Sequence, residues 1–226
     1  MGVHGGYSFG ENEDNFLEFS NDDDRVFDDT VLVAAADAFP DDQAFSDFEG
    51  GAHFGGQIGY DWQLGNFLIG AVGDISFVDV EDIVNGDSTS PGTPNYTFTR
   101  ELSFLATGRL RGGVTFDRFL AYVTGGVAYG NFDFEFDTAS AAVLGNVTDP
   151  DEDAWGYTVG GGVEAMLTQR VSFGVEYLYT DLDVDRQEAR FVSGPFVVAP
   201  GTGTDIRAED DEFNFHTVRG TVKFRF

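Results

Sequence analysis

The sequence has no cysteine, three histidines and one lysine, Lys223. Without cysteine the chain has no disulfide framework and no thiolate metal site. Lysine and arginine together number 12 against 40 Asp and Glu, which gives a formal net charge of −28. A chain with so few cations is unsuited to nucleic acid, because phosphates require a cationic surface. The negative charge instead favours binding of cations or basic partners, or an environment of high salt.

Long apolar runs are also missing, since no stretch approaches the roughly 18 apolar residues of a transmembrane helix. The start, Met1-Gly-Val-His4, lacks the basic residues and apolar core of a signal peptide. If the protein is exported, this sequence is expected to be a mature or trimmed form. A length of 226 residues predicts a single domain over residues 1–226.

Glycine and phenylalanine are abundant, at 30 and 24 residues, and much of the chain alternates with a period of two. The last segment, 213–226, shows this best: even positions after Asn214 are mostly apolar, whereas odd positions include Arg219, Lys223 and Arg225. A period of two predicts a β-strand with one apolar and one polar face. A cationic inner face with an apolar outer face is typical of a barrel in a membrane.

Eight such segments are joined alternately by short turns and long connections. They are residues 2–9, 50–62, 67–77, 99–116, 119–131, 157–167, 171–179 and 213–226. This pattern predicts an all-β fold: an eight-stranded antiparallel up-and-down transmembrane β-barrel with short periplasmic turns and long acidic extracellular loops. In segment 99–116 we expect Leu102, Phe104 and Leu110 to share the outer face. The alternative is a lipocalin-like barrel or a sandwich, but the minority faces are rich in Arg, Glu, Asp and Gly, which suits a narrow polar interior.

The polar faces carry charges that we expect to pair inside the barrel. Asp74 is a candidate partner of Arg109 or Arg111, and the carboxylates on neighbouring strands are candidate partners of the cations on the last strand. Such pairs either gate a pore or form a filled polar plug, and the small interior of eight strands favours the plug. The predicted lumen network is Asp74, Arg109, Arg111, Glu164, Glu176, Arg219 and Lys223.

Acids continue the outward register of several strands beyond the apolar positions, while Phe132, Phe134 and Phe136 are expected to point inward and close the mouth. Carboxylates at the level of the lipopolysaccharide headgroups are candidate ligands of Ca²⁺ or Mg²⁺, which prefer oxygen ligands. These ions would bridge the carboxylates to lipid phosphates. The alternative is a solvated acidic surface adapted to salt. The candidate metal ligands are Asp133, Glu135, Asp137, Asp181, Asp183 and Asp185, joined in the same register by Asp79 and Glu81.

No spacing of serine, histidine and acid suggests catalysis, so we expect neither an enzyme nor a cofactor apart from these cations. The histidines divide between the two faces: His4 and His53 are expected inside the barrel and His216 outside.

Several segments together resemble the alphaproteobacterial outer-membrane β-barrel family, which includes porin-family surface antigens and outer membrane immunogenic proteins. The resemblance rests on short motifs in a shared order and covers the strands but not the loops. The motifs are Gly-Val-His-Gly-Gly-Tyr-Ser-Phe (2–9), Gly-Gly-Gln-Ile-Gly-Tyr-Asp-Trp (55–62), Gly-Asn-Phe-Leu-Ile-Gly-Ala-Val-Gly-Asp-Ile (65–75), Thr-Gly-Arg-Leu-Arg-Gly (107–112), Phe-Leu-Ala-Tyr-Val-Thr-Gly-Gly-Val-Ala-Tyr-Gly (119–130), Val-Glu-Tyr-Leu-Tyr (175–179) and His-Thr-Val-Arg-Gly-Thr-Val-Lys-Phe-Arg-Phe (216–226). It implies an eight-stranded barrel of the bacterial outer membrane but no single activity.

The function predicted from these observations is a non-enzymatic outer-membrane barrel that contributes to envelope structure and surface properties. Its expected partners are membrane lipid, lipopolysaccharide, neighbouring envelope proteins and the barrel-insertion machinery. The alternatives are a narrow channel for ions or small solutes, and an adhesion or partner-binding module that uses the acidic loops, such as the Phe- and Asp-rich segment 27–48. The last strand resembles the terminal pattern read by the insertion machinery, through Val218, Val222, Phe224 and Phe226.

Overall fold

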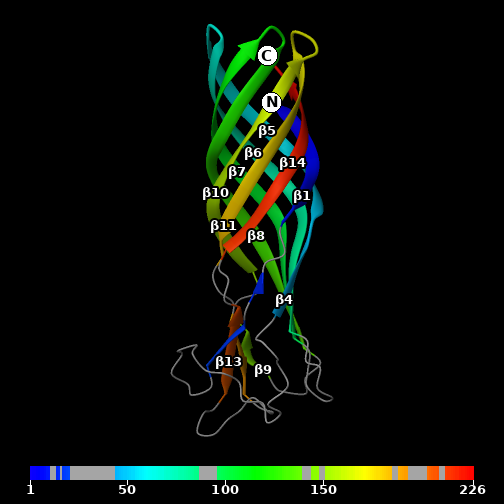
Figure 1. The fold of residues 1–226 in the computed structure, drawn as a ribbon, viewed down its shortest axis with the longest axis vertical. Coiled ribbons are helices and arrows are strands. Elements are labelled where there is room, and N and C mark those ends of the chain that lie inside the picture. The colour runs from blue at the N-terminus through cyan, green and yellow to red at the C-terminus, as the bar shows by residue number, and fades with distance from the viewer. Residues whose placement is uncertain are drawn as a thin grey trace.

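The structure, a computed structural model, is a tall ring of strands with further short strands beyond one end (Figure 1). It describes residues 1–10, 14–15, 17–20, 44–86, 96–138, 144–147, 151–184, 188–192, 203–208 and 212–226. Most of segment 27–48, including the apolar run 31–36, lies outside these residues. Among the described residues no helix is long and apolar enough to cross a membrane.

Eight long antiparallel strands form the ring. They are β1 (Gly2–Phe9), β5 (Gly51–Leu64), β6 (Phe67–Gly86), β7 (Tyr96–Phe116), β8 (Phe119–Thr138), β10 (Asp151–Met166), β11 (Val171–Asp183) and β14 (Glu212–Phe224). The sheet runs β6-β5-β1-β14-β11-β10-β8-β7, and pairing of β6 with β7 closes it. The two ends of the chain meet in this closure, because β1 pairs with β14 along its whole length, from Gly2 opposite Lys223 to Phe9 opposite His216. The predicted eight-stranded barrel is confirmed, and its closure leaves no free edge among the ring strands at this level.

Short turns join the strands at the end where the chain termini lie (Figure 1). Residues 65–66 join β5 to β6, with Gly65 at φ 64°, and residues 117–118 join β7 to β8, with Asp117 at φ 52°. Glycine and aspartate are among the residues that adopt this left-handed conformation most readily. The sequence thus supplies a suitable residue at the point where each tight hairpin requires it.

At the other end the strands extend well beyond the predicted segments. Strand β6 continues to Gly86 rather than Phe77, and β8 continues to Thr138 rather than residue 131. Strand β4 (Ala44–Glu49) pairs with the extension of β6, and β2 (Asp14–Asn15) pairs with β4. The predicted loops also contain a second antiparallel sheet of β3 (Leu17–Ser20), β13 (Thr204–Ala208), β12 (Glu188–Phe191) and β9 (Leu144–Val147). The long connections at this end, predicted as acidic loops, therefore include short strands.

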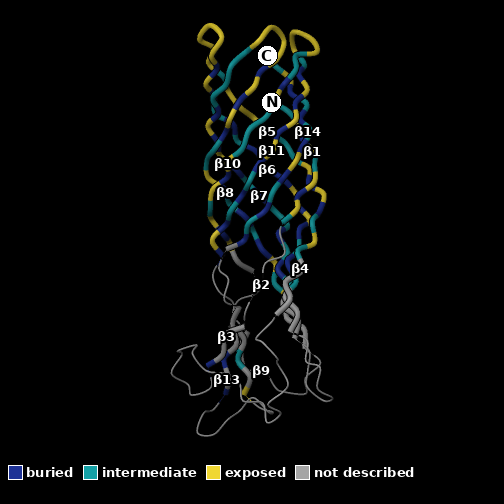
Figure 2. The backbone as a smooth tube through the Cα atoms, in the orientation of Figure 1, coloured by how far each residue is buried: buried dark blue, intermediate teal, exposed yellow. Residues whose placement is uncertain are grey.

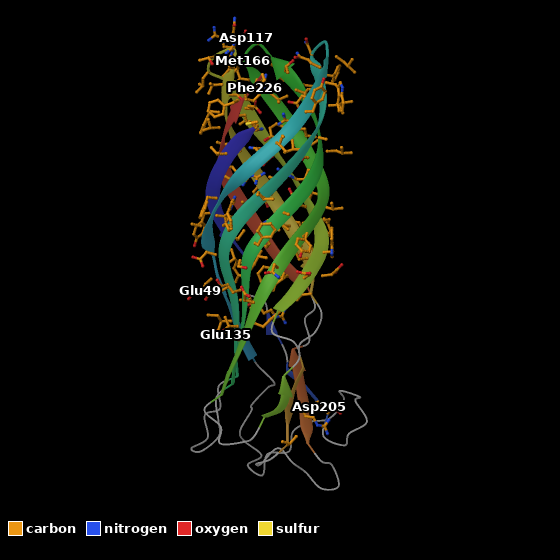
Figure 3. All side chains as sticks on the ribbon, turned by 180° about the vertical axis from the view of Figure 1, so that it is seen from behind. Glu49, Asp117, Glu135, Met166, Asp205 and Phe226 are labelled. Atoms are coloured by element: carbon orange, nitrogen blue, oxygen red, sulfur yellow. The ribbon has the colours of Figure 1, made fainter. Side chains whose placement is uncertain are left out.

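Burial alternates with the strand register and is inverted relative to a water-exposed barrel (Figure 2). Outward side chains such as Ile58 and Leu110 are 66% and 69% exposed, whereas inward Arg109 and Glu176 are 3% and 4% exposed. Exposed apolar side chains cover the outside of the ring, as the stick view shows (Figure 3). Apolar-out and polar-in alternation is what a strand between lipid and a filled lumen requires.

One residue breaks the alternation on β7 and corrects a prediction. The pairing of β7 with β8 shifts between Leu102 and Phe104, so Ser103 is an extra residue, as in a β-bulge. On the short-turn side of the bulge the inward residues of β7 have odd numbers, as at Arg109. On the loop side they have even numbers, as at Arg100. Leu102 therefore lies inside with no exposure, and its predicted place on the outer face is wrong. Because an extra residue exchanges the two faces of a strand, period-two counting cannot detect it.

The interior has two parts. Towards the loop end, Val80, Leu102, Phe132, Leu182 and Phe215, all with no exposure, belong to an apolar core. Phe132 is buried there and Phe134 packs against the core; the side chain of Phe136 lies outside the described residues. Towards the short turns most of the interior is polar and charged, beside a small apolar cluster of Leu68, Leu120 and Tyr122.

Candidate functional site in the barrel interior

Four charged side chains meet in the middle of the lumen, one from each of β6, β7, β11 and β14. Arg109 Nη2 lies 2.7 Å from Asp74 Oδ2, and Arg109 Nη1 lies 3.1 Å from Glu176 Oε1. Arg219 Nη1 lies 3.0 Å from Asp74 Oδ1, and Arg219 Nη2 lies 2.6 Å from Glu176 Oε2. These contacts form a closed ring of two carboxylates and two guanidiniums, which we call the central ion-pair ring.

The central ion-pair ring crosses the barrel rather than lining one wall. Strands β6 and β7 are neighbours, as are β11 and β14, but two further strands separate the two pairs on each side. The Arg109–Glu176 and Arg219–Asp74 contacts therefore bridge opposite walls. Thr107 Oγ1 donates to Asp74 at 2.7 Å and Tyr122 OH donates to Glu176 at 3.0 Å. The four charged side chains are at most 5% exposed, so at this height side-chain atoms fill the lumen.

A second charged cluster, nearer the short turns, gathers around Glu164. Its carboxylate accepts hydrogen bonds from Lys223 Nζ at 2.9 Å, Arg225 Nη2 at 2.8 Å and Ser172 Oγ at 2.5 Å. Arg111 Nη1 lies 3.7 Å from the same carboxylate. Arg111 also donates through Nε and Nη2 to both oxygens of Asp61. The ring of Tyr122 lies between the two clusters, with Arg111 and Lys223 at 5.5 and 5.2 Å from its centroid.

The structure therefore places all seven predicted network residues inside the barrel and selects their partners. Asp74 pairs with Arg109 and with Arg219, whereas Arg111 pairs with Asp61 and approaches Glu164. Asp61, Tyr122, Ser172 and Arg225 were not predicted as members. Asp61 and Arg225 have the inward register of their strands, which was the available signal, but nothing in a local pattern shows that they reach these partners.

Both inward histidines lie on the loop side of the central ion-pair ring. His4 Nε2 contacts Ser76 Oγ at 3.0 Å, and His53 Nδ1 contacts Ser8 Oγ at 3.3 Å. Each histidine is 5% exposed, so the Ser8–His53 contact is closed off from a large substrate. His216 lies on the outer face, where Tyr177 OH meets its Nδ1 at 2.7 Å and Phe9 stacks on its ring. The histidines thus occupy the faces that the sequence predicted.

Acidic residues concentrate at the outer rim, which is the part of the barrel on the loop side of the β7 bulge. The backbone register aligns Glu49, Glu81, Glu101, Asp133 and Asp151 in one row across β4, β6, β7, β8 and β10. Carboxylate oxygens of Asp79, Glu81 and Glu101 lie within 4.8 Å of one another. Burial, and then repulsion from Glu81 and Asp133, raises the pKa of Glu101 above its ordinary value.

The predicted metal ligands do not gather into one group. Asp133 and Glu135 extend the acidic row on β8 and are exposed. Asp181 and Asp183 lie on β11 with β10 between, and Asp181 accepts hydrogen bonds from Tyr157 and Tyr179. The side chain of Asp137, and Asp185 as a whole, lie outside the described residues. Glu101 was not predicted because the bulge alone turns it outward.

The last strand places its predicted assembly residues on one face. Val218 and Phe224 are each 45% exposed and Phe226 is 99% exposed, with Val222 in the same outward register. An outward apolar edge is what an insertion machinery could contact, but the contact itself remains a prediction.

Comparisons with known proteins agree with this architecture. A family model described as an outer membrane protein beta-barrel domain matches residues 1–226. The 22 kDa outer membrane protein of Rhizobium leguminosarum bv. viciae is 34% identical over 148 residues, which cover 62% of this chain and 60% of that protein. The 31 kDa outer-membrane immunogenic protein of Brucella melitensis biotype 1 is 28% identical over 229 residues, covering 100% of this chain and 82% of that one. The crystal structure of OprG from Pseudomonas aeruginosa has the same fold, with a TM-score of 0.50 at 14% identity over 97% of this chain and 93% of that one.

Proposed function

Because this chain belongs to the outer membrane protein beta-barrel domain family, we propose that it is a closed structural barrel of the bacterial outer membrane. In this role it stabilises the envelope and sets surface properties, without catalysing a reaction. Its short turns face the periplasm and its long acidic loops face outside, which is the usual arrangement of such barrels.

The central ion-pair ring is the observation that supports a closed barrel. Its cross-lumen contacts of 3.1 Å (Arg109–Glu176) and 3.0 Å (Arg219–Asp74) leave no space for a hydrated ion between them. An apolar core that includes Leu102 and Phe132 adds a second barrier towards the loops. A permeating solute would have to separate buried ion pairs and also cross an apolar layer, and separating such pairs costs several kcal/mol.

The acidic rim supports the proposed role at the cell surface. Cross-strand pairs of like charge, such as Glu81 with Glu101, destabilise a sheet. Divalent cations bound by these carboxylates would relieve the repulsion and bridge to phosphates of lipopolysaccharide. Lipopolysaccharide and outer-membrane lipid are therefore the partners we propose, together with the insertion machinery during assembly and neighbouring envelope proteins at the loops.

Planar-bilayer recording of the purified protein tests the closed barrel directly. Heat-modifiable mobility in gel electrophoresis establishes that the inserted sample is a folded barrel. With folded protein we expect no steady single-channel conductance. A steady conductance that is lost when the protein is unfolded would instead establish the competing function, a narrow channel for ions or small solutes.

A further inference from the structure

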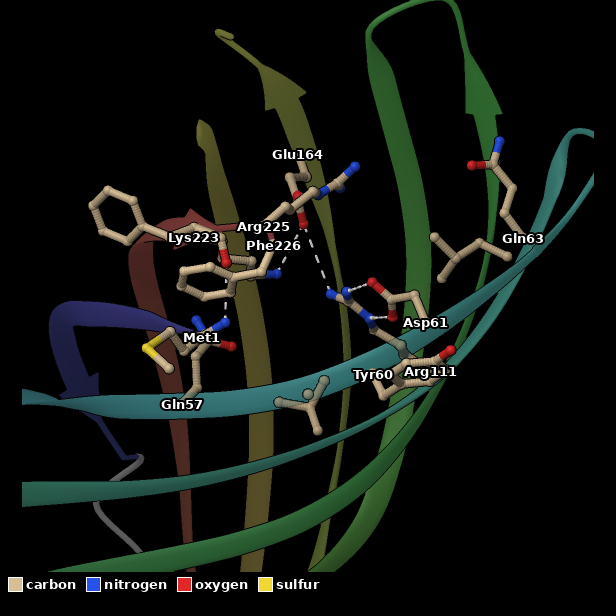
Figure 4. Close-up of a pocket in the computed structure, with 14 residues that line it drawn as sticks. Met1, Gln57, Tyr60, Asp61, Gln63, Arg111, Glu164, Lys223, Arg225 and Phe226 are labelled. Carbon is tan, nitrogen blue, oxygen red and sulfur yellow. Dashed lines mark hydrogen bonds and ion pairs between the residues drawn. The ribbon is translucent and has the colours of Figure 1, made fainter. Parts of the chain in front are cut away.

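A cavity of about 400 Å³ opens inside the barrel at the short-turn end (Figure 4). Its walls come from β5, β6, β7, β10 and β14 and from the last residues of the chain. Gln57, one of the lining residues, pairs in register with Asp74 of the central ion-pair ring, so the ring closes the cavity on the side facing the loops. The cavity is a dead-end pocket rather than part of a continuous pore, and its volume falls in the range of small-molecule sites.

Charged side chains converge on this pocket with one positive charge in excess. Arg111, Lys223 and Arg225 supply three positive charges, and Asp61 and Glu164 supply two negative ones. A ligand with a single negative charge would balance the pocket.

The cations keep hydrogen-bond donors for such a ligand. Lys223 Nζ, which has three N–H groups, donates to Glu164 alone, and Arg225 uses only Nη2 towards the same carboxylate, as far as the described residues are concerned. Arg111 donates through Nε and Nη2 to Asp61, while its Nη1 lies 3.7 Å from Glu164, beyond hydrogen-bond distance. Donors on all three cations therefore remain available.

Gln57 gives independent evidence that the pocket is incomplete without an acceptor. Its side chain is 9% exposed, and its Nε2 has no hydrogen-bond partner in the described part of the chain. A buried donor without a partner is costly, and most such groups in proteins are satisfied. On β6, between the strands of Asp61 and Arg111, Leu68 and Val72 supply apolar wall.

We propose that this pocket binds a small organic monoanion, a carboxylate with a short apolar tail. Guanidinium and ammonium groups match a carboxylate in charge and geometry, the Gln57 amide donates to it, and Leu68 and Val72 contact the tail. The inference goes beyond the structural role proposed above and is independent of whether the barrel conducts.

The test uses the full chain folded in detergent, with butyrate as the probe. It measures the dissociation constant for butyrate and the effect of butyrate on the melting temperature. Butylammonium and n-butanol control for charge and for the apolar tail, and inorganic phosphate is a competing anion. Arg225→Gln and Gln57→Leu each remove one proposed contact, with Arg118→Gln and Gln169→Leu in the turns as matched controls. Arg225 is partly exposed, so its substitution leaves the fold intact even if the Gln57 variant fails to fold.

Butyrate is expected to raise the melting temperature saturably, whereas butylammonium and butanol leave it unchanged. Arg225→Gln and Gln57→Leu are expected to weaken butyrate binding by about tenfold to a hundredfold, the effect of one lost hydrogen bond to a charged group. The turn variants bind as the parent does. The proposal is overturned if butyrate does not bind, if butylammonium binds as well, or if the two pocket variants bind normally. Tighter binding of phosphate than of butyrate overturns the assignment to a carboxylate.

Discussion

Replacing Arg219 tests whether the central ion-pair ring depends on charge balance. Arg219 is 2% exposed and contacts both Asp74 and Glu176. In Arg219→Met the ring keeps two carboxylates but only one guanidinium, Arg109, so one buried negative charge is left uncompensated. Breaking a buried ion pair in this way costs about 3–5 kcal/mol. We expect the free energy of unfolding to fall by that amount.

The double variant Arg219→Met/Glu176→Gln separates charge balance from loss of contacts. Asp74 and Arg109, 2.7 Å apart, remain as a neutral pair. The double variant is therefore expected to be no less stable than Arg219→Met, although it lacks one more charged group. Glu176→Gln alone also breaks buried ion pairs and is expected to cost about 3 kcal/mol, so the two substitutions are expected to couple by about 3 kcal/mol, at the upper end for residues in one network.

Urea unfolding of the protein in lipid vesicles, followed by tryptophan fluorescence, measures these differences. Arg118→Met is the matched control, because Arg118 lies in an exposed turn, where a substitution changes stability by about 0.5 kcal/mol or less. An unchanged denaturant slope shows that the variants unfold as the parent does. The reasoning is refuted if Arg219→Met costs no more than Arg118→Met, or if the effects of the two substitutions in the double variant simply add.

Three further predictions concern the rim and the last strand. The pKa of Glu101 is raised, so the folded state binds a proton at Glu101 more tightly than the unfolded state does. The repulsion between Glu101 and its acidic neighbours is therefore fully present above the folded-state pKa and is relieved as the pH falls. Glu101→Gln is therefore expected to stabilise the protein at pH 7 by about 0.2–1 kcal/mol, and this gain over the parent should shrink towards pH 4.5, the ordinary pKa of the group; a gain that does not change in pH-dependent unfolding contradicts the assignment. Millimolar Ca²⁺ is expected to raise the melting temperature of the parent, and to raise that of Glu81→Gln by a smaller amount. Asp117→Asn, the control at the opposite end of the barrel, is expected to respond as the parent does. No shift in the parent refutes cation binding at the rim. Deleting Phe226, which is 99% exposed, is expected to reduce insertion into the outer membrane, measured by the heat-modifiable fraction in membrane preparations, whereas normal insertion rules out its role as an assembly signal.

Strand identity and strand faces were available from the sequence because they depend on a local rule. In a strand, successive side chains point to opposite sides, so the alternation of residues 213–226 is enough to assign Val218 and Phe224 to the outside and Arg219 and Lys223 to the inside. The same rule, applied to eight segments with their short turns, gave the barrel. It also placed all seven network residues in the lumen.

Contacts between distant strands came only from the tertiary structure. That Arg219 reaches Asp74 on the opposite wall, and that Arg111 chooses Asp61, depends on the closure of the ring and the stagger of its strands, neither of which leaves a mark in a local pattern. The bulge at Ser103 was likewise visible only in the tertiary structure. One extra residue moves Leu102 inside and Glu101 outside, where Glu101 joins an acidic row assembled from five strands. The sequence by itself determined which residues face the lumen and which face lipid, because that follows from a period of two. Only the folded barrel decided which charges meet, because partner choice is set by strand register and by the narrow lumen that brings opposite walls together.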